Sequence, residues 1–386
     1  MIAAGLLALA LVSLLVALVQ ACSLRRHLKT KVRTAGVLPP ISILKPLCGV
    51  DDGLAWNLRS FADLDYPEYE VLLGVRDVRD PAYAVACRAA LTWPGRFRVV
   101  VQRGVPGLNP KVNQLITLEA AARHSIVVIS DSNVRVRAWY LREIAALLED
   151  PGVGLVTHPV VGVGERTLGA MLDNMQLTSG VAAGVVAAKR LAGRDIVVGK
   201  SMAMRRVDVH ALGGFARLKD VLAEDFVTGL LVRDQLGKLV ALAGTPVLNV
   251  VRDQSVARCF KRYLRWSVMQ RRAVGNVLYV SQAFLHPLLF AAAAVALDRA
   301  LAPALAGVVL AKVAIDEWAA RGPRKRGFRA GVLLSPAKDL VALAAFLGGL
   351  CTDRICWRGN HFRVLAGTVL EAIAPEEGEP LPVELA

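Results

Sequence analysis

The chain has 386 residues, of which 55% are apolar, and it carries a formal net charge of +15 at pH 7. This length suits one catalytic domain plus membrane segments, and a mean hydropathy of +0.46 is high for a soluble domain. The positive charge gathers in Arg25–Arg33, Arg258–Arg272 and Arg321–Arg329, each beside an apolar run. Basic clusters in such positions favour an anionic membrane surface as the partner and argue against nucleic acid.

The N-terminal run Ile2–Val19 contains no charged residue. As a helix it is long enough to cross a hydrocarbon core of about 30 Å. Basic residues follow this run and none precedes it, which is the reverse of the order in a signal peptide. By the positive-inside rule we predict a membrane anchor with its N-terminus outside and the residues from Arg25 on in the cytoplasm.

Short β-branched runs then alternate with longer helical patterns. Strands are expected at Ile41–Leu44, Tyr69–Val75, Phe97–Val101 and Ile126–Ile129, and helices at Leu54–Phe61, Pro81–Leu91 and Lys111–His124. This alternation predicts an α/β domain with a mostly parallel sheet covered on both faces. Ligands of such sheets bind beyond the carboxyl ends of the strands, so residues at those ends are the candidates for function.

The C-terminal third contains further apolar runs. We expect Val277–Leu297 and Leu301–Ile315 to form a helical hairpin before a cytoplasmic basic stretch at 322–327, and Leu340–Leu350 to form a short crossing or a re-entrant segment. The tail after Glu371 is rich in glutamate and proline and is expected to be disordered. The expected parts are a membrane anchor (1–22), a basic linker (23–38), a catalytic domain (39–255), an interfacial helix (256–275), membrane segments (276–352) and a tail (353–386).

Two carboxylates follow expected strands. Asp77 lies just after Val71–Val75, where it is either a turn residue or an acceptor for a base or ribose hydroxyl. Asp131 lies at the end of the apolar strand expected at Ile126–Ile129, and Asn133 comes two residues later. Such hard oxygen ligands suit Mg²⁺ or Mn²⁺ beside a diphosphate. Asp131 lies too far upstream to cap the helix expected at Arg137–Glu149, which favours the metal over a helix cap.

The pair Glu224 and Asp225 precedes a helix expected at Phe226–Gln235. Acids at this position are stabilised by the helix dipole, which is a sufficient structural reason for them. A carboxylate near the bond being made also serves as a general base for a hydroxyl. The sequence of this pair leaves both interpretations open.

The last motif is Arg262-Tyr-Leu-Arg265-Trp266, in a basic and aromatic stretch. Arg262 and Arg265 share one face of a helix because they are three positions apart. Such a helix lies in the lipid interface with Trp266 at headgroup depth, or its guanidinium groups bind a diphosphate while Trp266 shapes an acceptor pocket. The two interpretations are compatible.

In this order the motifs resemble those of the ceramide glucosyltransferase family, the lipid branch of the inverting GT-A transferases known as glycosyltransferase family 21. The family's Asp, strand-end Asp, Glu-Asp pair and (Gln/Arg)-x-x-Arg-Trp fall on Asp77, Asp131, Asp225 and Arg262–Trp266. Linking segments match as well, so that the resemblance covers roughly 40–365. These segments are Leu44–Leu47, Leu64–Pro67, Asn109–Asn113, Ala223–Phe226 and Trp357–Gly359.

The resemblance implies a Rossmann-like GT-A domain, a UDP-sugar donor and Mg²⁺ or Mn²⁺. It implies that Asp77 binds uridine, that Asp131 with Asn133 binds the metal and diphosphate, and that Asp225 is the base for the acceptor hydroxyl. Arg262, Arg265 and Trp266 would close the site, and Lys111 and Glu224 would bind substrate. Attack from the face opposite the nucleotide would invert the anomeric centre without a covalent enzyme intermediate.

The resemblance leaves the lipid open. Animal members have a His-Pro pair about where this chain has Thr178–Val181, and Asn133 replaces the second acid of the metal motif. Similar bacterial enzymes add sugars such as N-acetylglucosamine to hopanoid lipids, although the residues at Asn109–Lys111 and Ala223–Phe226 favour ceramide as the acceptor. A processive polysaccharide synthase would need more helices for a channel, and intact carboxylates argue against a non-catalytic scaffold. We therefore expect transfer of a hexose, glucose first, to the primary hydroxyl of ceramide at the bacterial inner membrane.

Overall fold

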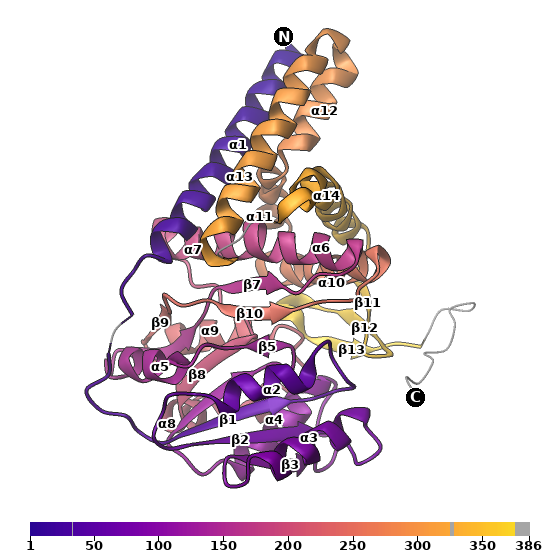
Figure 1. Ribbon diagram of the computed structural model, residues 1–386. Coiled ribbons are helices and arrows are strands. Elements are labelled where there is room, and N and C mark those ends of the chain that lie inside the picture. Colours follow the sequence, from indigo (N-terminus) through magenta and orange to yellow (C-terminus); the bar gives the residue numbers. More distant parts are fainter. Residues whose placement is uncertain (33, 325–327, 375–386) are drawn as a thin grey trace. The chain divides into compact units, whose positions relative to one another are not determined.

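The computed structural model describes residues 1–32, 34–324 and 328–374. The end of the basic stretch 322–327 and the tail from 375 on lie outside the described residues. The chain forms two compact units, and Figure 1 colours it along the sequence. The helical unit comprises Met1–Thr30, Val161–Arg194 and Val251–Asp353, and the sheet unit comprises Lys31–Val160, Asp195–Val250 and the residues from Arg354 on. Residues 161–194, which lie within the range expected for the catalytic domain, thus pack with the apolar helices.

The sheet unit is built around a seven-stranded sheet of order β3-β2-β1-β4-β8-β6-β9. Parallel pairing joins β1 to β2 and β4, β2 to β3, and β6 to β9, while β8 is antiparallel to β4 and β6. The strands are β1 (Ile41–Pro46), β2 (Tyr69–Val75), β3 (Phe97–Val101), β4 (Ile126–Ser130), β6 (Val153–Thr157), β8 (Ser201–Arg205) and β9 (Leu239–Leu242). The four predicted strands and the mostly parallel sheet are therefore confirmed.

Smaller β elements complete this unit. They are β5 (Val134–Arg135), which pairs with β10 (Val247–Val250), and the antiparallel sheet of β11 (Arg354–Trp357), β12 (Asn360–Val364) and β13 (Leu370–Ala372). Arg358 and Gly359 join β11 to β12 with φ angles of 52° and 77°. Positive φ at both central residues is the backbone shape that matches a two-residue turn to the twist of a hairpin.

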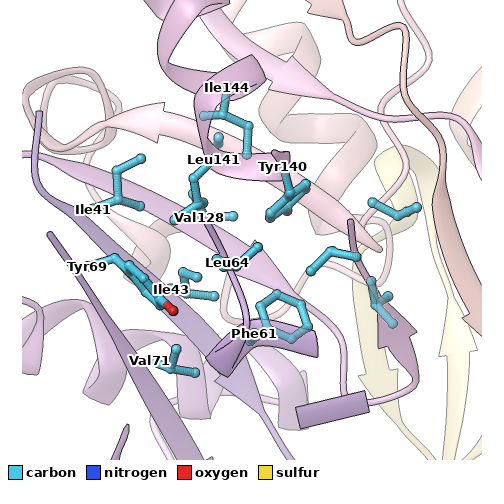
Figure 2. Close-up of a cluster of buried hydrophobic side chains, with 14 of the residues drawn as sticks. Ile41, Ile43, Phe61, Leu64, Tyr69, Val71, Val128, Tyr140, Leu141 and Ile144 are labelled. Atoms are coloured by element: carbon cyan, nitrogen blue, oxygen red, sulfur yellow. The ribbon is translucent and has the colours of Figure 1, made fainter. Parts of the chain in front are cut away.

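Helices cover both faces of the main sheet, as the alternation of strands and helices predicts. On one face Phe61 and Tyr140 pack against β1 and β4, as Figure 2 shows. On the other face Leu115 packs against the same strands. Neighbouring residues of β1 point to opposite faces, so Ile43 joins the first cluster and Leu44 the second. The helices are α2 (Leu54–Ala62), α3 (Pro81–Thr92), α4 (Pro110–Ala121), α5 (Tyr140–Leu148), α8 (Arg206–Ala211), η2 (Phe215–Leu218), α9 (Glu224–Asp234) and η6 (Ala366–Thr368).

Some helix ends differ from the sequence predictions. Helix α4 ends at Ala121 and not at the predicted His124, because the backbone turns there and the amide of His124 donates to Ser42 Oγ of β1 at 3.1 Å. Helix α9 begins at Glu224 and not at Phe226, so both acids of the Glu-Asp pair lie in its first turn. Helix α5 is likewise shorter than predicted.

The helical unit contains the apolar runs. Its elements are α1 (Ile2–His27), β7 (Val160–Val163, whose first residue belongs to the sheet unit), α6 (Leu168–Met175), η1 (Gln176–Ala182), α7 (Ala183–Ala192), α10 (Val256–Val274), α11 (Asn276–Val280), η3 (Ser281–Leu285), α12 (Pro287–Leu297), η4 (Arg299–Leu301), α13 (Ala302–Arg324), η5 (Arg329–Leu334) and α14 (Ser335–Cys351). Helices α1, α12 and α13 run side by side (Figure 1) and share a buried cluster of Ala10, Leu288, Ala291 and Val308. Helix α10 packs against α6 and α14.

By length and composition, α1 is the one helix within the described residues that could cross a membrane unaided, with a mean hydropathy of 2.9 in its most apolar stretch. The second predicted run is not one straight helix: it bends by 74° where His286 and Pro287 separate the 276–285 segment from α12. Proline at the start of α12 explains the break, because it cannot donate the backbone hydrogen bond that would continue the preceding helix. The third run does not end at Ile315 as predicted, since α13 continues to Arg324.

Candidate active site

The sheet places the two predicted strand-end acids at one edge. Strands β1, β2 and β4 are parallel, so the residues that follow them lie along their shared carboxyl edge. Asp131 follows β4 directly, and Asp77 follows β2 by two residues. The side chain of Asp77 is 39% exposed, and its Oδ1 accepts a hydrogen bond from the amide of Arg79 at 2.7 Å. Asp77 therefore shapes a turn and also presents a carboxylate to solvent at this edge.

Asp131 lies between two lysines. Its Oδ1 is 2.9 Å from Lys111 Nζ and its Oδ2 is 2.8 Å from Lys200 Nζ, while the side chain is 21% exposed. Burial raises the pKa of Asp131, but the attraction of Lys111 and Lys200 outweighs it and holds the pKa well below the usual range. Asp131 is therefore a permanent anion at neutral pH.

Lys111 joins this carboxylate to helix α9. It lies at the start of α4, where the Asn109 side chain caps the helix by accepting from the amide of Lys111 at 2.9 Å. Its Nζ is 2.8 Å from Glu224 Oε1 and donates to the carbonyl of Gly199 at 3.1 Å. Burial lowers the pKa of Lys111, but the surrounding carboxylates outweigh burial and raise it. Two sequence-predicted residues, Lys111 and Glu224, thus meet Asp131 in one cluster.

Asp225 lies beside this cluster in the first turn of α9. Its Oδ2 accepts from the amide of Gly199 at 2.6 Å and its Oδ1 from the amide of Phe226 at 2.8 Å. A side chain at Gly199 would come within 2.9 Å of Asp225 Oδ2 and 3.0 Å of Lys111 Nζ, so glycine permits this approach. Burial, followed by the charge of Glu224, raises the pKa of Asp225 to about 6. A carboxylate with this pKa can accept a proton near neutral pH.

Two lysines of the site were not predicted from the sequence. Lys200 Nζ contacts Asp131 Oδ2 and also donates to Asn133 Oδ1 at 2.9 Å. Lys45 is fully buried, and its Nζ donates to the backbone carbonyl of Asp131 at 2.8 Å. Burial lowers the pKa of Lys45 to about 7, although Asp131 opposes this shift. Lys45 lies in a matching segment, whereas Lys200 precedes β8, whose antiparallel position beside β4 no sequence pattern indicated.

The oxygens of Asp131 and Asn133 suit a divalent cation. An oxygen of each side chain contacts the same cation, the ammonium group of Lys200. Across the described ranges no three His, Cys, Asp or Glu side chains form a group that could hold a metal ion. An ion here would therefore take few ligands from the protein and others from phosphate or water, as Mg²⁺ commonly does. The residues fit a metal that binds together with a diphosphate.

The Arg-x-x-Arg-Trp motif lies on α10, which belongs to the helical unit. Arg262 Nη1 is 2.7 Å from Oδ2 of the fully buried Asp173, and the hydroxyl of Tyr263 donates to Oδ1 of the same carboxylate at 2.8 Å. The guanidinium of Arg262 also lies 4.8 Å from the centre of the Trp266 ring. Asp173 of α6, which the sequence analysis did not single out, thus positions the first arginine and through it the motif.

The C-terminal segment returns to the carboxyl edge of the main sheet. In the turn between β11 and β12, Arg358 Nη1 donates to the carbonyl of Cys48, two residues after β1, at 2.9 Å. The matching segment Trp357–Gly359 therefore belongs to the surroundings of the strand-end acids.

The chain is similar to several known proteins. Two curated relatives are Ceramide glucosyltransferase 3 of Caenorhabditis elegans, 26% identical over 260 residues (66% of this chain, 55% of that protein), and Ceramide glucosyltransferase of Komagataella phaffii, 28% identical over 240 residues (56% and 46%). The chain thus spans about half the length of the curated relatives it matches. A solved mannosyltransferase from Pyrobaculum calidifontis, in complex with GDP-Man and Mn²⁺, has a TM-score of 0.54 at 21% identity, with 88% of this chain and 99% of that chain covered. This likeness concerns the fold and confirms the predicted α/β GT-A class.

A family model, Glycosyl transferase family 21, matches residues 5–370 and therefore includes both units and every motif above. On this match the chain belongs to glycosyl transferase family 21.

Proposed function

We propose that this protein is an inverting, membrane-bound glycosyltransferase that moves a hexose, glucose first, from a UDP-sugar to the primary hydroxyl of ceramide. One observation carries the proposal: an anionic Asp131 and an Asp225 of raised pKa flank Lys111 at the ligand-binding edge of the sheet. Membership of family 21 and curated relatives named ceramide glucosyltransferases support the substrates.

The donor would lie along the carboxyl edge of the sheet. Asp77 would accept hydrogen bonds from the uridine, while Asp131 and Asn133 would hold Mg²⁺ or Mn²⁺. The ion, when bound, neutralises the charge that develops on the leaving diphosphate. Lys111 keeps Asp131 and Glu224 in place, because its ammonium contacts both carboxylates. The solved mannosyltransferase of similar fold contains Mn²⁺ and a nucleotide sugar, which supports the same arrangement.

Asp225 would act on the acceptor. With a pKa of about 6 it is mainly a carboxylate at pH 7, and it can take the proton of the primary hydroxyl as that oxygen attacks. The bond from the hydroxyl oxygen to the anomeric carbon forms while the bond from that carbon to the diphosphate breaks. UDP leaves with the electron pair and Asp225 keeps the proton, so one displacement inverts the anomeric centre.

The helical unit would bring the lipid. The apolar helix α1 would anchor the protein in the bacterial inner membrane with the sheet unit in the cytoplasm, and the basic segments would bind anionic lipid. Arg262, Arg265 and Trp266 would close the site against diphosphate and acceptor. Asp173 would fix Arg262 for this purpose.

Transfer to a hopanoid lipid is the second candidate. In place of the animal His-Pro pair, this chain has Thr178 and Ser179 in the π-helical turn η1. Their hydroxyls donate to the carbonyls of Asn174 and Met175, at 2.8 and 2.9 Å. The segment thus lacks the imidazole that the animal enzymes have in the acceptor region.

A product assay separates the candidates. Purified protein in detergent would receive Mn²⁺ or Mg²⁺, then UDP-glucose, UDP-galactose or UDP-N-acetylglucosamine, with ceramide and a hopanoid in parallel. Mass spectrometry should find one hexose on ceramide, and Asp225→Asn should abolish that product. Product on the hopanoid alone would move the protein to the second candidate, and a polymer would contradict both.

A further inference from the structure

We propose that Lys200 is a built-in counter-ion of the metal site, which makes the metal ion and the nucleotide diphosphate bind together. In this arrangement a divalent ion displaces the ammonium from Asp131 and Asn133, and the diphosphate gives the displaced ammonium a new anionic partner. The inference rests on the proposed function for the position of the metal and donor. It goes beyond that function by giving a lysine of this chain control over the coupling between metal and diphosphate binding.

The geometry places Lys200 on the metal ligands themselves. Its Nζ lies 2.8 Å from Asp131 Oδ2 and 2.9 Å from Asn133 Oδ1, the two oxygens that an ion would need. The side chains of Lys200 and Asp131 are only 15% and 21% exposed, so water screens this pair less than a surface ion pair. An ion that arrives alone must therefore break a partly buried charge pair before it can bind.

The second lysine on Asp131 is held differently. Lys111 also contacts Glu224 Oε1 at 2.8 Å and the carbonyl of Gly199 at 3.1 Å, so it keeps both partners if Asp131 turns to a metal. The contacts of Lys200 with Asp131 and Asn133 are lost at the same moment when an ion takes these oxygens. Lys200 contacts both side chains that would bind an ion, through Asp131 Oδ2 and Asn133 Oδ1, whereas Lys111 contacts Asp131 through Oδ1; metal binding therefore displaces Lys200 from both ligands.

The backbone around Lys200 is fixed, so the exchange is confined to its side chain. The amide of Gly199 is bound by Asp225. On the other side, the hydroxyl of Ser201 lies 2.6 Å from the hydroxyl of Tyr140 and 2.9 Å from His158 Nδ1, in a buried network. A lysine side chain has flexible bonds that allow its ammonium to move by several ångströms while its backbone stays in place.

Binding of Mn²⁺ without acceptor lipid tests the inference. Electron paramagnetic resonance of free Mn²⁺ would give the Kd for wild type, Lys200→Met, Lys200→Arg and the control Lys219→Met, each with and without UDP. Lys219 is an exposed lysine of the same unit, so its replacement removes the same charge away from the site. Circular dichroism would establish that each variant is folded.

We expect wild type to bind Mn²⁺ weakly alone and about tenfold or more tightly with UDP, a coupling of ordinary size for linked ligands. Lys200→Met should bind Mn²⁺ alone about tenfold more tightly than wild type and should gain much less from UDP. Lys200→Arg and Lys219→Met should behave as wild type. The inference is overturned if Lys200→Met binds Mn²⁺ alone no more tightly than wild type, if UDP helps it as much, or if no variant binds Mn²⁺.

The lipid transfer assay keeps this outcome separate from the proposed function. Coupling of Mn²⁺ and UDP through Lys200 without any sugar transfer to lipid would reject the proposed reaction and leave the inference standing. Transfer to ceramide with no effect of Lys200→Met on Mn²⁺ affinity would do the opposite.

Discussion

Each unit contains a cluster of lysines beside aspartates, but the two clusters differ in how far their side chains are exposed to solvent. In the helical unit, Lys338 Nζ lies 2.9 Å from Asp316 Oδ2 and 2.8 Å from Asp339 Oδ1, and Lys312 Nζ lies 2.7 Å from Asp316. These groups come from α13 and α14, and the Lys338 side chain is 2% exposed. Two cations and two anions balance each other there, and their side chains are at most 11% exposed.

The cluster around Asp131 is more open and less regular. Its groups lie next to strand ends or begin helices, and Lys111, Lys200 and Asp131 stay partly exposed. A charge pair within two packed helices holds those helices together, whereas a charge pair at strand ends can exchange a partner for a ligand. We therefore expect the Lys338 cluster to contribute to stability and the Asp131 cluster to contribute to chemistry.

The largest expected effect is on the proposed general base. Asp225→Asn removes the proton acceptor while keeping shape and hydrogen bonding capacity, so the turnover number should fall by about 10²–10⁴-fold. Quantified glycolipid product would measure the loss, and UDP binding by calorimetry should stay close to that of wild type. Asp234→Asn at the exposed end of the same helix is the matched control and should retain full turnover. A fully active Asp225→Asn enzyme would contradict the proposed reaction.

Asp131→Asn should have the next largest effect. It removes the anion between Lys111 and Lys200, so the two ammonium groups lose the carboxylate that both contact. Turnover should fall by about 10²–10³-fold, the size seen when one preorganised electrostatic group is lost. Product assays over a range of Mn²⁺ concentrations would measure it. Recovery of wild-type turnover at high Mn²⁺ would show that Asp131 contributes to metal affinity alone.

Substitution in the Lys338 cluster should lower the free energy of unfolding and should leave turnover unchanged. Lys338→Met leaves Asp316 and Asp339 short of a cation, and loss of one partner of a buried ion pair typically costs about 3–5 kcal/mol of unfolding free energy. Denaturant unfolding in detergent, followed by tryptophan fluorescence, would measure the change, while turnover per folded molecule should remain near that of wild type. The double variant Lys338→Met/Asp339→Leu keeps the Lys312–Asp316 pair and should be much less destabilised. A stable Lys338→Met protein with low turnover would reverse the roles of the two clusters.

Local patterns account for the parts of this molecule that the sequence predicted. The mostly apolar run at 69–75 is buried on both faces, and its composition indicates a buried strand of a parallel sheet. Asp131 could be singled out because it follows such a strand, whereas Asp225 was assigned its role by the family resemblance, because its place before a helix left two interpretations open. The first of these assignments needs only a few neighbouring residues.

Contacts between distant segments account for what the sequence did not reveal. Lys200 reaches Asp131 only because β8 inserts antiparallel beside β4, with Ser201 opposite Ser130. Asp173 meets Arg262 across 89 positions, and nothing in either segment indicates the other. The bend at His286 was marked by its proline, but its angle of 74° depends on packing.

The smallest predicted effect is a pH dependence that only the open cluster should produce. Lys45, whose pKa burial lowers to about 7, also changes charge in this cluster. Asp225 must be ionised to accept a proton, and its folded pKa is about 6, so its own effect on kcat/KM should be level above that pH. Below it the protonated fraction grows and kcat/KM should fall about tenfold for each further pH unit. Asp131 does not titrate in this range, because Lys111 and Lys200 hold its pKa well below. Initial rates between about pH 4.5 and 8.5 would show the inflection, and the residual activity of Asp225→Asn should lack it. Lys338→Met should keep the inflection of wild type, because the Lys338 cluster takes no part in proton transfer. A displaced inflection in that variant would show that the two clusters interact electrostatically, and that stability and chemistry are not divided between them.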